Sequence, residues 1–566
     1  MATHDYVIDN STGANVRTDL NNVLQAILTN NSSGSAPSTT AAYMLWADTS
    51  NNLLKMRNSA NDGWIDLRTL TGGLTSSADA TINSITVGKG ANSVAGNTVL
   101  GETALDASVT GGNNTAIGNN ALTANTSGTH NVAVGALALD ANTEGATNIA
   151  IGYSALGGNT TGIRNVASGH GAIESNTTGG RNVGIGYAAL NANTTAGYNT
   201  AIGNEALTAN TTASYNVAVG SNSLKLNTTG TQNVAVGADA LDETTTGDNI
   251  TAVGYEALSK STTASSNTAV GSKALRDNTT ASNNTAVGKD ALLLNTTGSS
   301  NVAVGASALD ANTTAVNNTA VGTSALGANT TASSNTAIGT ETLLTNTTGT
   351  NNTALGSESL KFNTTADNNT ALGKSVLQAN TTGTQNTAVG ALALDANTTG
   401  GQNTGLGYEA LTKNTTASYN TAVGAYSLED NTTGANNTAV GYQALVENTT
   451  ANNNTGVGYY ALKANTTGTR LVAVGSLALV ANTTANNNVA VGYTALTANT
   501  TGANNTALGD QCLAANTTAS NNVGIGKDAL AANTTGGGNT AVGDAALNAN
   551  TTGHSNTAVG KSAGRH

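Results

Sequence analysis

Few residues in this chain of 566 residues have the type and spacing that chemistry requires. Histidine is a frequent metal ligand, and the five histidines are His4, His130, His170, His554 and His566. They occupy unrelated positions of the repeat described below, so we predict surface side chains and no shared metal site. No paired carboxylates, nucleophile with a base, or phosphate-binding loop stands out from that repeat. We therefore expect a protein that is not an enzyme and uses no metal or cofactor.

The acidic residues would bind calcium if they formed a regular ladder along the chain. Instead they vary from copy to copy at turn positions such as Asp140, Glu144, Asp242, Glu243 and Asp290. We interpret them as solvated charges that limit aggregation. The net charge of −12 argues against binding to nucleic acid.

Tyrosines recur at one position of the repeat, directly after a glycine, at Tyr153, Tyr187, Tyr255, Tyr408, Tyr442 and Tyr493. Aromatic faces stack on pyranose rings, so a sugar-binding stripe is one interpretation. Half-buried packing between neighbouring copies is the interpretation that we favour, and a glycan array separates the two.

All of these residues except His4 lie within or beside one internal repeat, so the structure of that repeat determines where their side chains lie. From Asn114 onward the sequence follows a strict 17-residue period, and a glycine closes each of 27 copies from Gly118 to Gly560, with Gly101 in one more. A period so short and so poor in apolar residues predicts an elongated repeat architecture.

Each copy has the pattern of a strand with an anchor. A leucine such as Leu122 comes four residues after the glycine. The residue directly before the glycine is aliphatic, as Val134 is, and the residue two positions before that aliphatic one is Thr or Val, as Val132 is. Side chains alternate along a strand, so the Thr/Val and aliphatic positions share one face and the alanine between them has the other. We expect the leucine and the aliphatic residue to be buried, with small alanine and glycine positions near neighbouring chains.

The segment Asn-Thr-Thr that follows has the composition of a turn. The next position holds Gly or Ala, as at Ala196, Ala213 and Ala281, so this turn does not demand a positive φ.

These patterns predict an all-β fold, a long parallel β-solenoid of 17-residue coils. A helical repeat is the competing interpretation, but one period is too short for a helix pair, and Thr, Asn and Gly are poor helix formers. The 28 coils, stacked about 4.8 Å apart, would make a shaft of about 130 Å. Because two large aliphatic side chains per coil cannot offset the entropic cost of ordering the whole coil, we expect lateral association into a homotrimeric fibre.

Residues 1–70 differ in composition and predict a separate small α+β module. Apolar residues recur at helical spacing from Val16 to Leu28, and three strand-like runs follow at 43–48, 53–58 and 64–68. The connections between these runs suit hairpins, so we expect a three-stranded meander with its tryptophans in the core.

Residues 71–96 are predicted to form a linker and irregular first coils, and residues 97–566 the shaft. In the last copy Gly564 occupies the leucine position, so we expect an exposed strand edge at that end. A docking site there would involve His554, Lys561, Arg565 and His566.

The chain shows no cationic start with an apolar run and no stretch of about 18 apolar residues, so we expect neither a signal peptide nor membrane insertion. Its single cysteine, Cys512, replaces a repeat residue beside a leucine and is interpreted as a small core residue.

The first 70 residues resemble the amino-terminal module of tail fibre proteins of bacteriophages, particularly phages of cyanobacteria. The resemblance rests on Tyr6-Val-Ile-Asp-Asn, Leu20-Asn-Asn-Val-Leu-Gln-Ala, Trp46-Ala-Asp, Leu54-Lys-Met-Arg-Asn and Trp64-Ile. It implies that this end attaches to the virion, through residues such as Tyr6, Asp9, Leu20, Trp46 and Trp64.

The repeats also resemble the β-roll heads of trimeric adhesins, in which Asn-x-Val-Ala-Ile-Gly motifs stack in an assembly of three chains. Asn131-Val-Ala-Val-Gly and Asn148-Ile-Ala-Ile-Gly are the nearest matches, although the period here is longer than is usual in those heads.

These resemblances together imply a viral tail fibre, made in the host cytoplasm and located in the virion. Its partners would be a phage tail or baseplate protein at the amino terminus and, at the carboxyl terminus, a host-surface glycan or protein or a separate tip protein. A bacterial trimeric adhesin and an ice-binding solenoid, suggested by the stacked threonines, are the alternatives.

Overall fold

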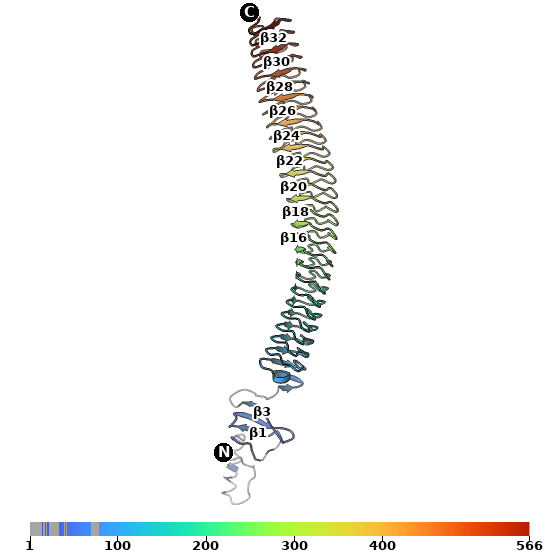
Figure 1. Cartoon of the computed structure of the whole chain (residues 1–566), viewed down its shortest axis with the longest axis vertical. Coiled ribbons are helices and arrows are strands. Elements are labelled where there is room, and N and C mark those ends of the chain that lie inside the picture. Colours follow the sequence, from blue (N-terminus) through green and yellow to red (C-terminus); the bar gives the residue numbers. More distant parts are fainter. Residues whose placement is uncertain are drawn as a thin grey trace. The chain divides into compact units, whose positions relative to one another are not determined.

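The computed structural model describes residues 14, 17, 18, 20, 21, 33–38, 40, 42–69 and 79–564 (Figure 1). It comprises two compact units, residues 1–196 and residues 197–566, and each is described by itself.

The first unit begins with an antiparallel sheet in the order β1-β2-β3. Its strands are β1 (Leu45–Asp48), β2 (Leu53–Arg57) and β3 (Trp64–Thr69). The predicted three-stranded meander is therefore confirmed. The predicted helix from Val16 to Leu28 falls largely outside the described residues, of which 17, 18, 20 and 21 have helical geometry.

A second antiparallel group leads into the repeat. It contains β4 (Ala80–Ile82) and β5 (Ile85–Gly88), followed by a short 3₁₀ helix, η1 (Ala91–Ser93), and β6 (Thr98–Gly101). One edge of β6 pairs antiparallel with β5, and its other edge pairs parallel with β7. The first coil thus has its outer edge covered, as an edge strand requires.

Parallel three-residue strands then recur once per repeat. In the first unit they are β7 (Thr115–Ile117), β8 (Val132–Val134), β9 (Ile149–Ile151), β10 (Val166–Ser168) and β11 (Val183–Ile185). In the second unit they are β12 (Thr200–Ile202), β13 (Val217–Val219), β14 (Val234–Val236), β15 (Thr251–Val253), β16 (Thr268–Val270), β17 (Thr285–Val287), β18 (Val302–Val304), β19 (Thr319–Val321), β20 (Thr336–Ile338), β21 (Thr353–Leu355), β22 (Thr370–Leu372), β23 (Thr387–Val389), β24 (Thr404–Leu406), β25 (Thr421–Val423), β26 (Thr438–Val440), β27 (Thr455–Val457), β28 (Val472–Val474), β29 (Val489–Val491), β30 (Thr506–Leu508), β31 (Val523–Ile525), β32 (Thr540–Val542) and β33 (Thr557–Val559).

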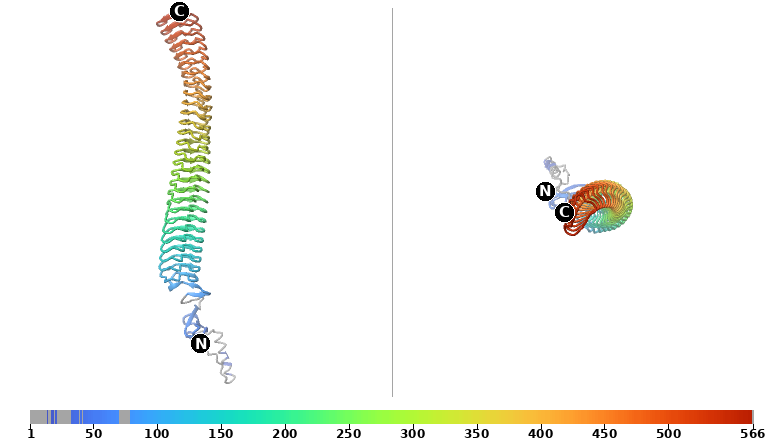
Figure 2. Two further views of the ribbon diagram at one scale, coloured as in Figure 1. Left: turned by 90° about the vertical axis from the view of Figure 1, so that its right-hand side faces the viewer. Right: turned by 90° about the horizontal axis from the view of Figure 1, so that it is seen from above.

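Within each unit these strands form an in-register ladder. In β19 and β20, for example, Thr319 pairs with Thr336, Ala320 with Ala337 and Val321 with Ile338, so the partners are separated by one period of the repeat. The predicted parallel β-solenoid of 17-residue coils is confirmed. The 22 strands of the second unit stack into a ladder about 100 Å long, and successive coils turn gradually relative to one another (Figure 2).

The interior of each coil differs from the expectation in one respect. The alanine at the middle of each strand, such as Ala320, is fully buried, whereas its neighbours Thr319 and Val321 are partly exposed. The alternation of faces was predicted correctly, but the assignment of the aliphatic position to the interior was wrong. The interior of so small a coil has room for alanine on the strand, so the larger side chain lies outside.

The leucine predicted as an anchor is fully buried in coil after coil, as at Leu309 and Leu326. These leucines have positive φ angles of 52° and 54°, in the left-handed region. That conformation costs a non-glycine residue about 1–2 kcal/mol, which is of the order of the free energy gained by burying a leucine side chain. The turn glycine after Asn-Thr-Thr, such as Gly298, does not have a positive φ, as predicted.

Two columns of buried asparagine complete the interior. Asn318, at the start of a strand, donates from Nδ2 to the carbonyl of Ala332 at 2.9 Å, and its Oδ1 accepts from the backbone N–H of Asn335 at 2.9 Å. Asn329, in the Asn-Thr-Thr segment, donates to Oδ1 of Asn312 at 3.0 Å and to Ala332 at 3.0 Å. Each coil is therefore joined to the next by side-chain hydrogen bonds as well as by the backbone ladder.

Candidate functional site

The outward side of the strands is a regular surface of the repeat, which we call the ladder face. It consists of the first and third residues of the parallel strands, taken in each unit separately. The third residue is aliphatic in all of these strands except β10, which has Ser168, and it is well exposed at Ile338 (37%), Leu355 (42%) and Leu372 (41%). The first residue is Thr or Val, except for Ile149 in β9. From β19 to β27 it is always Thr, so threonine hydroxyls form a column beside the aliphatic column there. An apolar column of this length on a protein surface favours an interaction site.

The residues assigned to virion attachment are only partly described. Tyr6 and Asp9 lie outside the described residues, and Leu20 is exposed. Trp46 is buried and its ring lies 5.1 Å from that of Trp64, centroid to centroid. The prediction that the tryptophans form the core of the small sheet is confirmed for Trp46, whereas Trp64 packs against it and is only partly buried.

The small sheet also holds cations and one buried carboxylate. Lys55 Nζ lies 5.4 Å from the Trp46 ring and 3.3 Å from Asp48, while the Arg57 guanidinium lies 5.3 Å from the Trp64 ring. Burial alone would raise the pKa of Asp48, but hydrogen bonds from Asn51 and Ser50, together with Lys55, outweigh it and lower the pKa below its usual range. This network explains why Asp48 can be buried, and it shows no catalytic arrangement.

Of the residues assigned to distal docking, only His554 and Lys561 are described, and each contacts a different residue of the preceding coil. His554 is exposed and its Nδ1 accepts a hydrogen bond from the backbone N–H of Gly537 at 2.9 Å. The exposed Lys561 lies 3.6 Å from Asp544. Arg565 and His566 lie outside the described residues.

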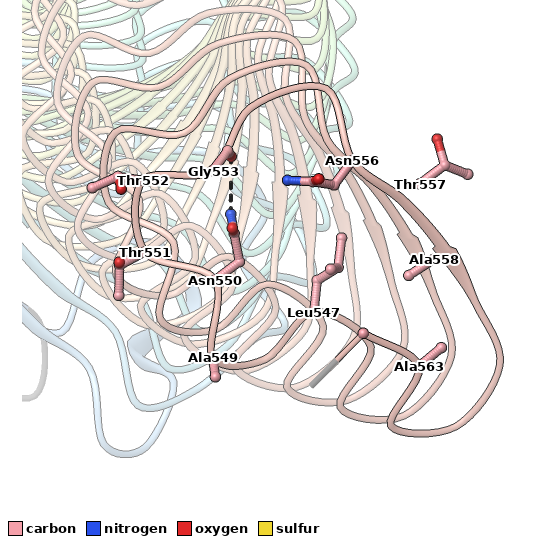
Figure 3. Close-up of a pocket in the computed structure, with 11 residues that line it drawn as sticks. Leu547, Ala549, Asn550, Thr551, Thr552, Gly553, Asn556, Thr557, Ala558 and Ala563 are labelled. Carbon is pink, nitrogen blue, oxygen red and sulfur yellow. Dashed lines mark hydrogen bonds between the residues drawn. The ribbon is translucent and has the colours of Figure 1, made fainter. Parts of the chain in front are cut away.

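An open hollow of about 660 Å³ lies over the last described coils (Figure 3). It is lined by side chains that form the interior in other coils, among them Leu547, Asn550 and Asn556. Asn550 donates to the carbonyl of Gly553 at 3.1 Å, so its amide is already engaged (Figure 3). Neither His554 nor Lys561 lines the hollow.

The remaining histidines and the acidic residues are dispersed. His130, His170 and His554 are exposed, as predicted, while His4 and His566 lie outside the described residues. Among the described residues no three His, Cys, Asp or Glu side chains converge in a way that would hold a metal ion.

The predicted tyrosine positions lie on the surface at the corner that follows each strand. In the first unit Tyr153 and Tyr187 stack on either side of His170, with ring centroids 5.1 and 5.4 Å apart. In the second unit Tyr408 and Tyr442 both pack against Tyr426. Four of the six tyrosines therefore contact aromatic rings of neighbouring coils, while each of the four stays 41–54% exposed. These contacts agree with packing between coils and leave the exposed ring faces open to a sugar, so the two interpretations are compatible here.

None of the described residues forms a helix with the length and apolar character of a membrane span. Comparisons with protein families, with curated proteins and with solved structures found no match for this chain.

Proposed function

We propose that this chain is a structural, non-catalytic fibre subunit, the shaft of a viral tail fibre that holds a recognition surface away from a virion. The observation that carries the proposal is the ladder, which repeats one coil without interruption through β12 to β33. Support for the virion comes from the resemblance of residues 1–70 to tail fibre modules. Localisation to the virion and attachment through the small sheet belong to the same proposal.

A shaft must resist bending, and the bonding between coils supports that role. Neighbouring coils of the second unit are joined by one pair of strands with three residue pairs in register, as in β19 and β20. They are also joined by asparagine bonds such as Asn335 to Asn318, and by threonine bonds such as Thr313 Oγ1 to the carbonyl of Thr330 at 3.1 Å. Bending the ladder would stretch all of these on one side. Short coils joined by so many bonds suit a rigid spacer.

The ladder face supports association with further copies of the chain, as a homotrimer or a related bundle. A strand of three residues is about 10 Å wide, and the ladder of the second unit is about 100 Å long, so this face offers about 1,000 Å² per chain. A stable interface of standard size buries about 800 Å² per partner. A second copy has the same 17-residue period and can match the face along its length, which few unrelated proteins could do.

Sedimentation of the purified chain tests this association. We expect a species of three chains, and a stable monomer would contradict the proposal. The informative variant replaces Ile338, Leu355 and Leu372 together by Asp, because carboxylates on an apolar interface would dissociate the chains.

The matched control places three Asp residues at Thr331, Thr348 and Thr365, exposed turn residues in consecutive coils. The control is expected to keep the mass of the parent protein and an unchanged circular dichroism spectrum. Equal dissociation by the two triple variants would show that added charge, and not the ladder face, is responsible.

Attachment to a virion needs a separate experiment. Phage particles whose genome encodes this chain should be labelled at the tail by antibodies raised against residues 197–566. Absence of the chain from purified particles would refute the tail-fibre assignment while leaving the association through the ladder face untouched.

One observation favours a second function, ice binding. Threonines such as Thr319, Thr336 and Thr353 form a regular outward column on the ladder face. Measurement of thermal hysteresis tests this directly. The two functions compete for one surface, because a homotrimer built through the ladder face would cover the threonines.

A further inference from the structure

Five tyrosines gather on four consecutive coils of the second unit, after β24, β25, β26 and β27. We call this group the tyrosine cluster: Tyr408, Tyr426, Tyr442, Tyr459 and Tyr460. Tyr426 and Tyr460 come one residue later in their coils than the other three, so the repeat pattern alone did not reveal them.

The rings of the tyrosine cluster hold one another in place. The centroid of Tyr442 lies 5.9 Å from that of Tyr426 and 5.8 Å from those of Tyr459 and Tyr460. The Tyr442 and Tyr459 rings are nearly parallel, at 13°, whereas Tyr426 is almost perpendicular to Tyr442, at 89°. Offset and edge-on contacts of this kind are favourable and reduce the conformational entropy that a ligand would have to remove on binding.

The fold does not require these aromatic residues. The position of Tyr442 holds Ser357, Lys374 and Ala391 in earlier coils, which have the same strands and the same register. Tyr408, Tyr442 and Tyr459 are nevertheless 45%, 41% and 47% exposed. The coil does not need these aromatic side chains for its stability, yet they form a preorganised exposed surface. Such a surface indicates that a ligand binds there.

Polar groups lie beside individual rings of the tyrosine cluster. A hydrogen bond to Glu409 raises the pKa of Tyr408, which places that carboxylate against the phenol group. The ammonium group of Lys463 lies 4.7 Å from the centre of the Tyr460 ring. Lys413 and Asp430 form an ion pair between two of the same coils. Hydrogen-bond donors and acceptors therefore both lie close to the rings.

We propose that the tyrosine cluster binds a saccharide chain along the side of the ladder. The C–H faces of pyranose rings would lie on the tyrosines, and sugar hydroxyls would bond to Glu409 and Lys463. This inference goes beyond the fibre proposal, since it needs neither a virion nor the end of the chain. A second copy of this chain is a less suitable occupant, because copies matched through the ladder face use every coil equally, whereas the tyrosine cluster occupies four.

The test starts with the intact chain on a printed array of bacterial and plant oligosaccharides and polysaccharides. A saccharide retained on the array is then titrated by calorimetry against a variant with Tyr442→Ser and Tyr459→Ser. Serine at this position occurs in other coils, such as Ser357 and Ser476, so the variant is expected to keep its circular dichroism spectrum. We expect affinity to fall about 10- to 100-fold.

The control variant carries Tyr255→Ser and Tyr493→Ser, which remove exposed tyrosines from the same repeat position outside the tyrosine cluster. It is expected to bind like the parent protein. The inference is overturned if the parent chain binds no saccharide on the array, or if the two variants lose affinity equally. It is also overturned if loss of Tyr442 and Tyr459 changes the sedimenting mass, because the tyrosine cluster would then lie between copies of the chain.

Discussion

Replacement of one coil glycine by alanine should open the solenoid locally. Gly322 has a φ of +136°, which side chains of L residues rarely adopt. A Cβ atom there would lie 2.4 Å from the carbonyl oxygen and 2.6 Å from the carbonyl carbon of Gly339, in the next coil. The strained φ costs about 1–3 kcal/mol and the overlap another 1–3 kcal/mol, so we expect a loss of about 4 kcal/mol from Gly322→Ala.

Amide hydrogen exchange followed by mass spectrometry measures this loss where it occurs. A solenoid unfolds in local segments, so peptides that cover β19 and β20 report on the altered coil. A loss of about 4 kcal/mol corresponds to exchange roughly 10³-fold faster there. Peptides around β13, far along the ladder, should exchange as in the parent protein.

The matched control is Gly298→Ala. A Cβ at Gly298 would also meet a carbonyl oxygen, that of Ala315 at 2.2 Å, but its next two neighbours are side-chain atoms of Asn295 and Asn312. Its φ is not positive, and Ala315 shows that alanine is accepted at this repeat position. If the two substitutions change exchange equally, the argument from the positive φ is wrong.

Three further predictions concern the interior and its charges. Asn318→Ala should lower the free energy of local unfolding, measured by hydrogen exchange, by about 3 kcal/mol, since it leaves the buried N–H of Asn335 without its acceptor and also leaves a cavity. Asn318→Leu removes the same acceptor but fills the space, as the buried Leu471 does at the equivalent position, so it should cost less. Burial and neighbouring carboxylates raise the pKa of Asp242 from 3.8 to about 6, so the contribution of Asp242 to the stability of the fold falls as pH rises from 4 to 6. After allowance for solvent screening, we expect Asp242→Asn to stabilise the protein by about 1 kcal/mol in thermal melts at pH 8. At pH 3, where the carboxyl group is largely protonated in both states, the variant should melt like the parent protein. Burial raises the pKa of Cys512 to about 12, so iodoacetamide at pH 8 should label it only in denaturant; labelling of the native protein would show that this part of the interior opens.

The ladder could be predicted from sequence because its signals are local and repeated. Thr319 and Val321 are β-branched or aliphatic at alternate positions, which favours a strand, and the strict period brings equivalent residues of successive coils into register. The buried leucine was predicted for the same reason, since it recurs at one position. The position of Cys512 holds a small residue in nearly all coils, most often alanine as at Ala495, and this residue is buried in every coil except the last, so the cysteine lies in the interior.

The alternation of side chains along a strand defines two faces, but it does not show which of the two is buried in the coil. The choice depends on the volume inside a coil, where Ala320, Leu326 and two asparagines already fill the space. Leucine has no preference for a positive φ, so its sequence position gave no sign of the corner it makes. The asparagine of Asn-Thr-Thr was interpreted as a turn residue. The recurrence of asparagine at two positions of nearly all coils was the signal that could have revealed the two buried amide columns.

Because the coils of the ladder are so similar, the alignment of the chains in a fibre has to be set by the part of the chain that does not repeat. On the fibre that we propose, two chains shifted by one coil would still match along 21 of the 22 strands of the second unit. The ladder face can therefore supply association energy but almost no preference for one alignment, as in strands whose side chains do not distinguish registers. Alignment must come from segments without the period, and the small sheet of β1 to β3, in which Trp46 packs against Trp64, is such a segment. The small sheet would thus fix the alignment of the chains in addition to any attachment that it makes.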